Sequence, residues 1–453
     1  MSENNTSEKL EPVFDFTSQE SVILDSGNME LHSNGNIFPC NGEVRLDLTP
    51  SPSIHFYASF DSSCSVPFFP PPVTGSSLSL YFKGKKVDGF PLSFGGFKST
   101  DGERVDMMPI KWCPASEPIT GIGNEDTRIN HVVFHLCNFP EFSGFRDSSE
   151  KVGSALHAIH YIDLEYDKWI IELKSLTTTN QNIKQLKVEG GNRLTHVGQI
   201  RKADSSDFTG KETNEILDAT RHFISFANGC WCNPVCAVGF DKNKVRVWES
   251  WISPQGRWRN SISWFDPRHG EQLVQLFPLF MKKWGDEFWR EALREIIYLY
   301  LSANDSSHGI DIGIIVTQAA LERFSYEYSV NDRKLLSSEG FKSLRASDKY
   351  RMFFSSLQLP LDIPAETSDL VAQSKQNNFR WTDAPESLTE IRNSLVHPDH
   401  KKRGKMDNVL FDTWNLGLWY LELGTLALCE YKGSYSNRLR ANRWVGQVEQ
   451  VPW

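Results

Sequence analysis

Apolar and polar residues alternate along much of the first 200 residues, and a period of two is the pattern of half-buried β-strands. Clusters of Gly, Pro, Ser and Asn separate these segments, as expected of turns. The predicted strands cover residues 43–48, 53–60, 78–82, 131–136, 160–166 and 168–173. Together they predict an antiparallel sheet or sandwich.

Helical spacing of apolar residues dominates the later part of the chain. Thr209 and Glu212 have the spacing of a capping box, and Gly229 is suited to end a helix, which predicts a helix over 209–228. Further strands are predicted at 235–240 and 244–251. Helices are then predicted at 286–302, 311–328, from 386 to His397, and 407–431. In the helix at 311–328, the predicted core positions are Ile312, Ile315, Val316, Ala319 and Leu321.

These elements predict an α+β protein, with an N-terminal, mainly β, sandwich-like region followed by a C-terminal all-α bundle. We expect residues 1–12 to be disordered and residues 13–269 to form the β-rich region, including the helix at 209–228. Residues 270–453 are expected to form the helical domain. The boundary is placed at a polar turn near 267–270.

Composition and charge narrow the possible partners and the location. The 453 residues are 39% hydrophobic and 23% charged, and no stretch of 18 apolar residues or secretory leader is recognised. We therefore expect a cytoplasmic protein with no membrane partner. The net charge of −9 argues against a general nucleic-acid coat. A local basic run remains a candidate RNA-binding site, and it consists of Lys401, Lys402, Arg403 and Lys405.

No metal site or cofactor is predicted. Cys230, Cys232 and Cys236 cluster, but a structural zinc site needs four ligands, and the nearest upstream imidazole is His222. Three ordinary buried cysteines are therefore expected there. His131 and His135 share a strand face without a carboxylate or thiol at ligand spacing.

The segment Arg392–Pro398, with sequence RNSLVHP, carries the most specific chemistry of the chain. It combines a permanent cation, Arg392, with an imidazole, His397, that exchanges protons near neutral pH. Pro398 disfavours the α conformation at His397, so the helix is predicted to end there. That end frees the imidazole to turn towards Arg392, although positions five apart on a continuous helix diverge.

Four predicted helices with this Arg-Asn-x3-His element resemble the HEPN ribonuclease family over residues 285–431. Residues 194–202, with the helix over 212–228 and Gly229, also resemble the N-terminal domain of ApeA-type bacterial anti-phage proteins. The resemblance implies cleavage without metal, giving 2′,3′-cyclic phosphate and 5′-hydroxyl ends. It also implies a homodimer, or a higher homo-oligomer, formed through the helical domain with the two motifs facing each other.

Ribonuclease chemistry assigns a role to each candidate side chain. His397 is the candidate general base or acid, and Arg392 would stabilise charge on the phosphate. Asn393 would bind the scissile phosphate or orient His397. The resemblance suggests that Glu322 orients Arg392. The alternatives are a plain surface ion pair for Glu322, a carboxylate partner such as Glu390 or Asp399 for Arg392, and a helix-capping role for His397.

The expected function is therefore metal-independent endoribonuclease activity on structured RNA, with tRNA as the expected substrate. The resemblance suggests bacterial anti-phage defence by abortive infection, released by a phage-derived trigger. One alternative is a HEPN-like module that binds RNA or a nucleotide without cutting it. Another is a sensor whose sheet binds a phage component and whose helices serve dimerisation.

Overall fold

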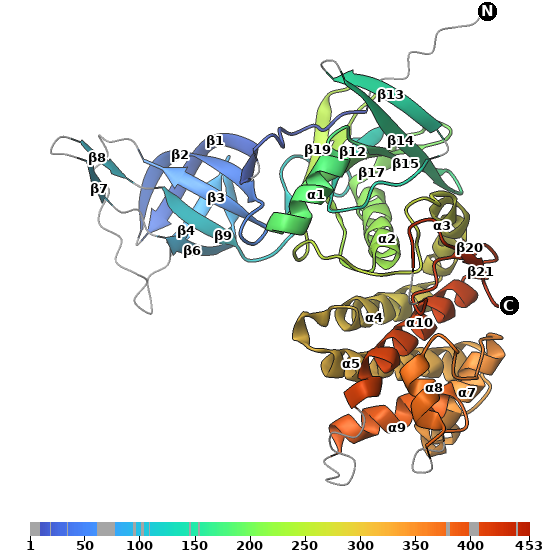
Figure 1. Cartoon of the computed structure of the whole chain (residues 1–453). Helices are drawn as coiled ribbons and strands as arrows, with labels where there is room; N and C mark the ends of the chain where they lie inside the picture. Colours follow the sequence, from blue (N-terminus) through green and yellow to red (C-terminus); the bar gives the residue numbers. More distant parts are fainter. Residues whose placement is uncertain are drawn as a thin grey trace, which may run out of the picture. The chain divides into compact units, whose positions relative to one another are not determined.

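The computed structural model describes residues 10–18, 20–33, 35–60, 78–93, 97–100, 104–107, 109–144, 146–152, 155–376, 381–397, 407–440 and 443–453. Strands dominate the N-terminal region and helices the C-terminal region, so the predicted α+β class is confirmed (Figure 1).

The strands are β1 (Ser21–Ser33), β2 (Asn36–Asp47), β3 (Ser53–Ser59), β4 (Leu78–Phe82), β5 (Lys85–Val87), β6 (Gly89–Ser93), β7 (Phe97–Thr100), β8 (Arg104–Met107), β9 (Ile110–Pro114), β10 (Ile119–Thr120), β11 (Arg128–Ile129), β12 (His131–Cys137), β13 (Arg146–Val152), β14 (Ala155–Tyr166), β15 (Trp169–Ser175), β16 (Leu194–Lys202), β17 (Phe208–Thr209), β18 (Pro234–Phe240), β19 (Arg246–Trp251), β20 (Ser434–Tyr435) and β21 (Glu449–Gln450).

The helices are α1 (Thr179–Glu189), α2 (Gly210–Asn228), α3 (Glu271–Trp284), α4 (Glu287–Ala303), α5 (Ile310–Tyr326), α6 (Ser338–Ser343), α7 (Ala346–Ser356), α8 (Ser368–Ser374), α9 (Ala384–Val396) and α10 (Leu410–Leu428). Short 3-10 turns cover Ser306–His308 and Asp407–Val409, and a π-helical turn over Glu327–Asp332 extends α5.

The larger strands form two sheets. One has the strand order β5-β4-β1-β2-β3-β9-β6, with antiparallel pairing throughout. The other has the order β10-β19-β18-β12-β16-β15-β14-β13. The first sheet buries alternate side chains in a core that also contains side chains of β18 and β19. Strand β1 is not among the predicted strands, and a register shift between Ile23 and Asp25 interrupts its alternation.

The chain divides into two compact units that are not continuous in sequence. Unit 1 contains Met1–Phe139, Leu173–Leu217 and Asn233–Trp258, and unit 2 contains Pro140–Glu172, Asp218–Cys232 and Arg259–Trp453. The predicted boundary at 269/270 therefore falls inside unit 2.

The predicted disorder of residues 1–12 is wrong at its C-terminal end. The Leu10 side chain is buried against Val133 and Val197, and the Leu10 carbonyl accepts a hydrogen bond of 2.8 Å from Lys174 Nζ. An apolar anchor and a satisfied carbonyl fix this part of the chain. Residues 1–9 lie outside the described residues.

Local signals predicted α2 accurately. The Glu212 N–H donates to Thr209 Oγ1 at 3.2 Å, and the Thr209 N–H donates to Glu212 Oε2 at 2.8 Å, so the capping box is present. Gly229 follows the helix with a φ of +72°, a conformation that glycine adopts without a steric cost. Helix α3 was not predicted, and it contains Pro278, a residue that normally disfavours a helix interior.

A buried ion pair lies at the centre of unit 2. Glu422 of α10 and Arg438 are both almost fully buried, with 2.7 Å between Glu422 Oε1 and Arg438 Nη2. Tyr300 of α4 donates to the same carboxylate oxygen at 2.6 Å. Arg438 also donates to the carbonyl of Ile262. This network connects α4, α10 and the C-terminal segment through one desolvated carboxylate.

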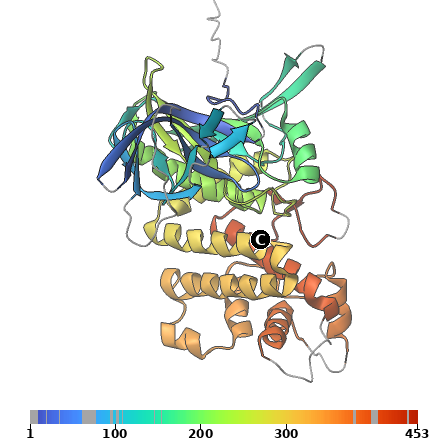
Figure 2. The ribbon, with the colours of Figure 1, turned by 90° about the vertical axis from the view of Figure 1, so that its left-hand side faces the viewer.

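Helices α4, α5 and α10 pack side by side in unit 2 (Figures 1 and 2). Helices α5 and α10 approach closely because small residues lie between them. A Cβ added at Gly417 would lie 2.5 Å from Thr317 Cγ2, and one added at Gly313 would lie 2.7 Å from Trp414 Nε1. The Trp414 indole in turn donates to the carbonyl of Ala303 at 2.7 Å. The position of α10 on α5 therefore depends on the absence of side chains at these two positions.

Gly417→Ala is expected to destabilise the protein by about 1–3 kcal/mol, because its methyl group would overlap Thr317 in a packed core. Urea unfolding of the full chain measures the change. Gly340→Ala is the matched control: Gly340 lies in α6, where a Cβ would meet nothing closer than 3.3 Å. That control should stay within about 0.5 kcal/mol of the wild type. Equal effects of the two changes would contradict the close packing of α5 and α10.

Candidate functional site

Helix α9 carries the Arg392–His397 motif, and its N-terminus is fixed by polar contacts. Asp383 is the N-cap residue and accepts a hydrogen bond of 2.9 Å from the Glu386 N–H. Arg351 of α7 binds the same carboxylate, with 3.0 Å between Nη2 and Oδ1. This hydrogen bonding to Asp383 raises the pKa of Arg351. A forked guanidinium–carboxylate contact fixes orientation as well as position, so α7 sets where α9 begins.

The C-terminus of α9 lies where the proline signal predicted it. The helix ends at Val396, and His397 is extended, with φ −100° and ψ 119°. The His397 N–H still donates to the Asn393 carbonyl at 2.9 Å. The His397 side chain is exposed. The imidazole therefore projects from the helix end and is accessible to a large substrate.

Helices α5 and α7 hold the middle of α9. Gln318 of α5 is 4% exposed and donates from Nε2 to the carbonyl of Leu388, one turn before Arg392. The Tyr350 hydroxyl of α7 donates to the Gln318 carbonyl at 3.1 Å. Burial raises the pKa of Tyr350, the charge of Glu322 raises it further, and the charge of Arg392 lowers it. Both charges therefore act on one buried hydroxyl.

Arg392 is half-buried and makes no ion pair within the described part of the chain. Its Nη1 donates to Asn393 Oδ1 at 3.2 Å, and Asn393 itself is exposed. The alternative carboxylate partner Asp399 lies outside the described residues. Arg392 and Asn393 thus lie near the C-terminal end of α9, and His397 follows directly after that end. One helix therefore carries a guanidinium, an amide and an imidazole within six residues.

The expected role of Glu322 is not supported by its contacts. Glu322 Oε1 lies 2.7 Å from Lys349 Nζ, so its ion-pair partner is Lys349 of α7 and not Arg392. The Lys349 side chain is only 11% exposed, and a desolvated ammonium group requires a carboxylate. Glu322 thus neutralises the ammonium group of Lys349, and the sequence did not predict this contact.

Two predicted core positions of α5 are also wrong. Ile312 is 47% exposed and Ala319 is exposed, whereas Gly313, Ile314 and Thr317 are buried. The buried stripe is shifted because α10 packs on the small residues Gly313 and Thr317. Gln318 is buried against α9.

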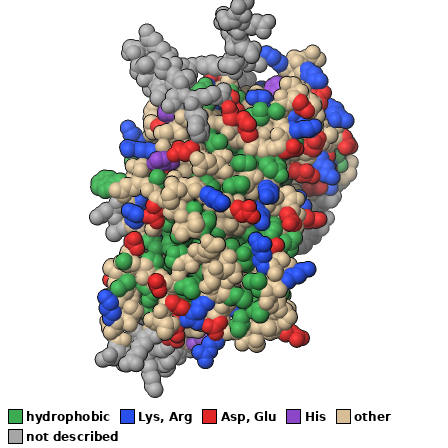
Figure 3. All heavy atoms as spheres, turned by 90° about the vertical axis from the view of Figure 1, so that its right-hand side faces the viewer, with side chains coloured by type: hydrophobic (Ala, Val, Ile, Leu, Met, Phe, Trp, Pro, Cys, Tyr) green, Lys and Arg blue, Asp and Glu red, His purple; other side chains and the backbone are tan. Residues whose placement is uncertain are grey.

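The predicted basic RNA-binding run lies outside the described residues. Lys401, Lys402, Arg403 and Lys405 all fall in the segment 398–406, together with Pro398. On the face drawn in Figure 3, Lys and Arg side chains are interspersed with Asp and Glu side chains.

No group of three or more His, Cys, Asp or Glu side chains in the described residues is placed to hold a metal ion. Cys230, Cys232 and Cys236 are not joined in a disulfide. His135 uses both ring nitrogens within the fold: Nε2 accepts from the Val13 N–H at 2.9 Å, and Nδ1 donates to the Cys236 carbonyl at 3.1 Å. Burial lowers the pKa of His135 to about 4, so this imidazole is neutral at physiological pH.

Comparisons with known proteins give a family likeness without an activity. Residues 124–261 match the family described as the YopA central domain, and residues 286–450 match the YopA C-terminal domain. The chain is 28% identical over 446 residues to the SPbeta prophage-derived uncharacterized protein YopA of Bacillus subtilis (strain 168), covering 96% of this chain and 95% of that protein. No solved structure matches the chain. Every helix in the described residues is too short or too polar to cross a membrane.

A second titratable cluster, which the sequence analysis did not identify, lies in the seven-stranded sheet. Asp47 Oδ2 accepts hydrogen bonds from Tyr57 at 2.8 Å and from Lys111 at 2.8 Å, and lies 2.9 Å from His55 Nδ1. Burial raises the pKa of Asp47, but the hydrogen bonds from His55, Lys111 and Tyr57 outweigh it and lower the pKa to about 2. With three partners on one oxygen, the carboxylate connects β2, β3 and β9 and acts as a structural cross-link.

The Asp47 cluster predicts a defined acid sensitivity. Because the pKa of Asp47 in the folded protein lies below its ordinary value of 3.8, the carboxylate stabilises the fold above about pH 4. This stabilisation is lost as the pH falls towards 2, and it is on the order of 1–2 kcal/mol. Urea midpoints measured from pH 5 to pH 2.5 should show this loss in the wild type but not in Asp47→Asn. The exposed Asp88→Asn serves as the control, and parallel curves for wild type and Asp47→Asn would contradict the assignment.

Proposed function

We propose that the chain is a metal-independent endoribonuclease of the HEPN type, with its active site at the C-terminal end of α9. The observation that carries the proposal is the exposed His397 at the end of the helix that carries Arg392, a half-buried guanidinium that makes no ion pair within the described residues. A guanidinium without a carboxylate partner and an accessible imidazole on the same helix suit an anionic ligand that exchanges protons.

The reaction uses the nucleophile that RNA itself carries. His397 removes the proton of the ribose 2′-hydroxyl, or protonates the leaving 5′-oxygen, and Arg392 stabilises the charge that grows on the non-bridging phosphate oxygens. Asn393, hydrogen-bonded to Arg392 at 3.2 Å, orients the guanidinium or donates to the same phosphate. The products are a 2′,3′-cyclic phosphate and a 5′-hydroxyl. No step requires a metal ion.

Structured RNA, and tRNA in particular, is the proposed substrate. The net charge of −9 disfavours a long single strand along the surface, whereas a hairpin loop needs only a local site. The basic residues that follow the motif in sequence are proposed to contact the phosphates of such a loop, and they are Lys401, Lys402, Arg403 and Lys405. The relative described as prophage-derived is compatible with a role in conflict between phages and bacteria, by abortive infection after a phage-derived trigger.

The nuclease is proposed to act as a homodimer that forms through the helices of unit 2. Val396 adjoins His397 and is 41% exposed, and Phe411 at the start of α10 is 58% exposed. Ile312, 47% exposed, lies in the first turn of α5, whose Gly313 packs on Trp414 of α10. These three apolar side chains come from α9, which carries the motif, and from α5 and α10, which contact α9. A second copy would cover them and supply a second imidazole to the site.

Cleavage is expected when purified full-length protein is incubated with total cellular RNA in EDTA, and the cut ends are mapped. His397→Ala and Arg392→Ala should each lower the rate by about 10²- to 10⁴-fold, because they remove the proton-transfer group and the charge-stabilising group. Growth arrest on expression should be lost in the same two variants. The matched controls are His308→Ala and Arg290→Ala, outside the motif, which should cut as the wild type does.

The catalytic proposal fails if the wild type neither cuts RNA nor arrests growth differently from the two motif variants. RNA binding that persists in all variants without cleavage would instead support the alternative of a non-catalytic binding module. Cleavage that disappears in EDTA would contradict the metal-independent mechanism.

Phe411→Glu is expected to convert a dimer into a monomer, because a buried carboxylate without a partner is costly at an apolar interface. Sedimentation equilibrium at micromolar concentration measures the mass of the full chain. Val188→Glu, at a residue that is 86% exposed on α1, is the control and should leave the dimer intact. A wild type that is already monomeric, or an unchanged mass for Phe411→Glu, would contradict the proposed interface.

A further inference from the structure

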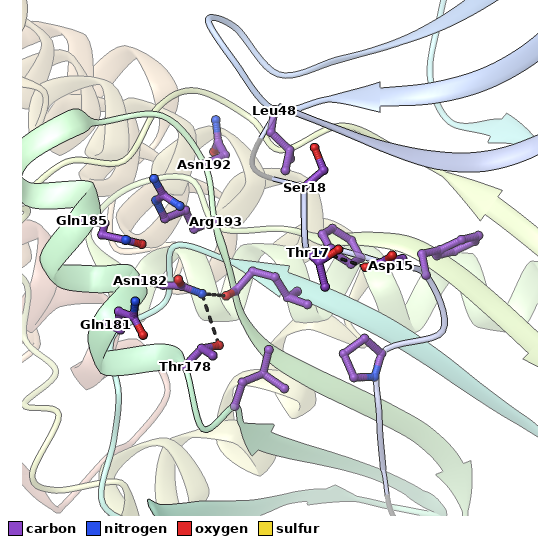
Figure 4. A pocket seen from close by; sticks show the side chains of 15 residues that line it. Asp15, Thr17, Ser18, Leu48, Thr178, Gln181, Asn182, Gln185, Asn192 and Arg193 are labelled. Atoms are coloured by element: carbon purple, nitrogen blue, oxygen red, sulfur yellow. Dashed lines mark hydrogen bonds between the residues drawn. The ribbon is translucent and has the colours of Figure 1, made fainter. Parts of the chain in front are cut away.

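Unit 1 contains cavities that the motif chemistry does not involve. One lies beside α1, and two of its polar side chains are Asn192 and Arg193 (Figure 4). These are 2% and 8% exposed and are bound by Asn138 and Glu189, so they serve the fold. Another cavity, of about 500 Å³, lies on β1, β2 and β3, on the face that points away from the core. Its polar side chains are accessible.

The floor of the cavity on β1, β2 and β3 is a grid of polar side chains. Asn41, Glu43 and Arg45 alternate along β2 with residues of the core. The strand register places Ser59 of β3 opposite Asn41, and Tyr57 opposite Glu43. Neighbouring strands lie about 4.8 Å apart, and alternate residues of one strand lie roughly 6.7 Å apart. Hydrogen-bonding groups therefore repeat on the scale of one sugar residue.

The ion pair of Glu43 and Arg45 presents a donor and an acceptor side by side. Arg45 Nε and Nη2 lie 2.7 and 2.5 Å from Glu43 Oε2, and the guanidinium carbon lies 4.8 Å from the centre of the Tyr57 ring. These contacts orient the guanidinium. They leave Arg45 Nη1 and Glu43 Oε1 without a partner among the described residues, on side chains that are 38% and 35% exposed. A donor beside an acceptor matches two adjacent hydroxyl groups, because each hydroxyl both donates and accepts.

The charges at this cavity disfavour an anionic ligand. Arg45 is neutralised by Glu43. Lys111, which lies 5.4 Å from the Tyr57 ring, is neutralised by Asp47 at 2.8 Å. Among the described residues that line the cavity, Arg45 is the sole Lys or Arg. Phosphates and nucleic acids are bound chiefly by unpaired cations, and these lining residues supply none.

Flat apolar ligands and extended peptides also find little to bind here. Pro109 is the sole aliphatic side chain among the described lining residues. The cations of Arg45 and Lys111 lie over the Tyr57 ring, in the space that a stacked nucleobase would need. Strands β1, β2 and β3 are interior strands of their sheet, so their backbone groups cannot pair with a peptide strand. A neutral ligand with many hydroxyl groups suits the lining best.

We propose that this cavity binds a neutral oligosaccharide. One hydroxyl group of a sugar residue accepts from Arg45 Nη1, and the adjacent hydroxyl group donates to Glu43 Oε1. The Asn41 amide both donates to and accepts from hydroxyl groups further along the ligand. Ser26 and Ser59 line the same cavity and add two hydroxyl groups. The site lies in unit 1, and its existence does not depend on the ribonuclease proposal.

Isothermal titration of the full-length protein tests the proposal with four neutral oligosaccharides, the hexamers of the maltose, cellulose, chitin and β-1,3-glucan series. A heparin hexasaccharide and a uridine hexanucleotide are the anionic comparison ligands. At least one neutral oligosaccharide should bind with a saturable isotherm and a Kd of about 1 mM or below. If no neutral oligosaccharide saturates the protein, or if an anionic ligand binds more tightly than all of them, the proposal is wrong.

Substitutions in the floor distinguish a binding role from a structural one. Asn41→Ala removes the amide and should weaken binding by about tenfold, the effect of one lost hydrogen bond. Its unfolding midpoint in urea should not fall, because the side chain is exposed. Arg45→Lys keeps a cation beside Glu43 but lacks the forked guanidinium, and it should weaken binding similarly. Asn36→Ala, exposed on β2 and outside the lining, is the matched control. Wild-type affinity in both floor variants would overturn the assignment.

Discussion

The packing of the helices in unit 2 depends on the buried carboxylate of Glu422. Arg438 and Tyr300 satisfy this carboxylate in a region that excludes water, so loss of either partner would leave a buried group with an unmet interaction. Breaking a buried pair of this kind typically costs about 3–5 kcal/mol, although the intact pair itself adds little. The network therefore specifies how α4, α10 and the C-terminal segment pack, and the small residues Gly313 and Gly417 then allow α5 to approach α10.

The position of the Arg392–His397 motif depends on that packing. Helix α5 reaches α9 through Gln318, and α7 reaches both through Tyr350 and through the contact of Arg351 with Asp383. These contacts fix the backbone of α9 and leave its last turn accessible. Arg392 and His397 thus lie on and directly after a helix whose middle and start are fixed by neighbouring helices. The proposed reaction would use such a fixed backbone to position the two side chains.

Local chemistry made part of the structure predictable. The capping box of α2 and the proline after His397 act within a few residues, and both helix ends lie where these signals put them. Glu322 and Lys349 lie 27 residues apart in sequence, and we recognise no motif in α7 that would predict their ion pair. The burial of Gln318 and the exposure of Ile312 depend on which helix packs on α5, and one helix alone does not contain that information.

In the proposed reaction, the RNA 2′-hydroxyl attacks the phosphate at the site formed by Arg392 and His397. The most direct measurement compares cleavage of an RNA hairpin with cleavage of the same hairpin carrying a single 2′-deoxy nucleotide on the 5′ side of the mapped cut. We expect the all-RNA hairpin to be cut in EDTA to leave a 2′,3′-cyclic phosphate, and the 2′-deoxy hairpin to stay intact at that position. Cleavage of the 2′-deoxy hairpin at the same bond, or products with 5′-phosphate ends, would contradict it.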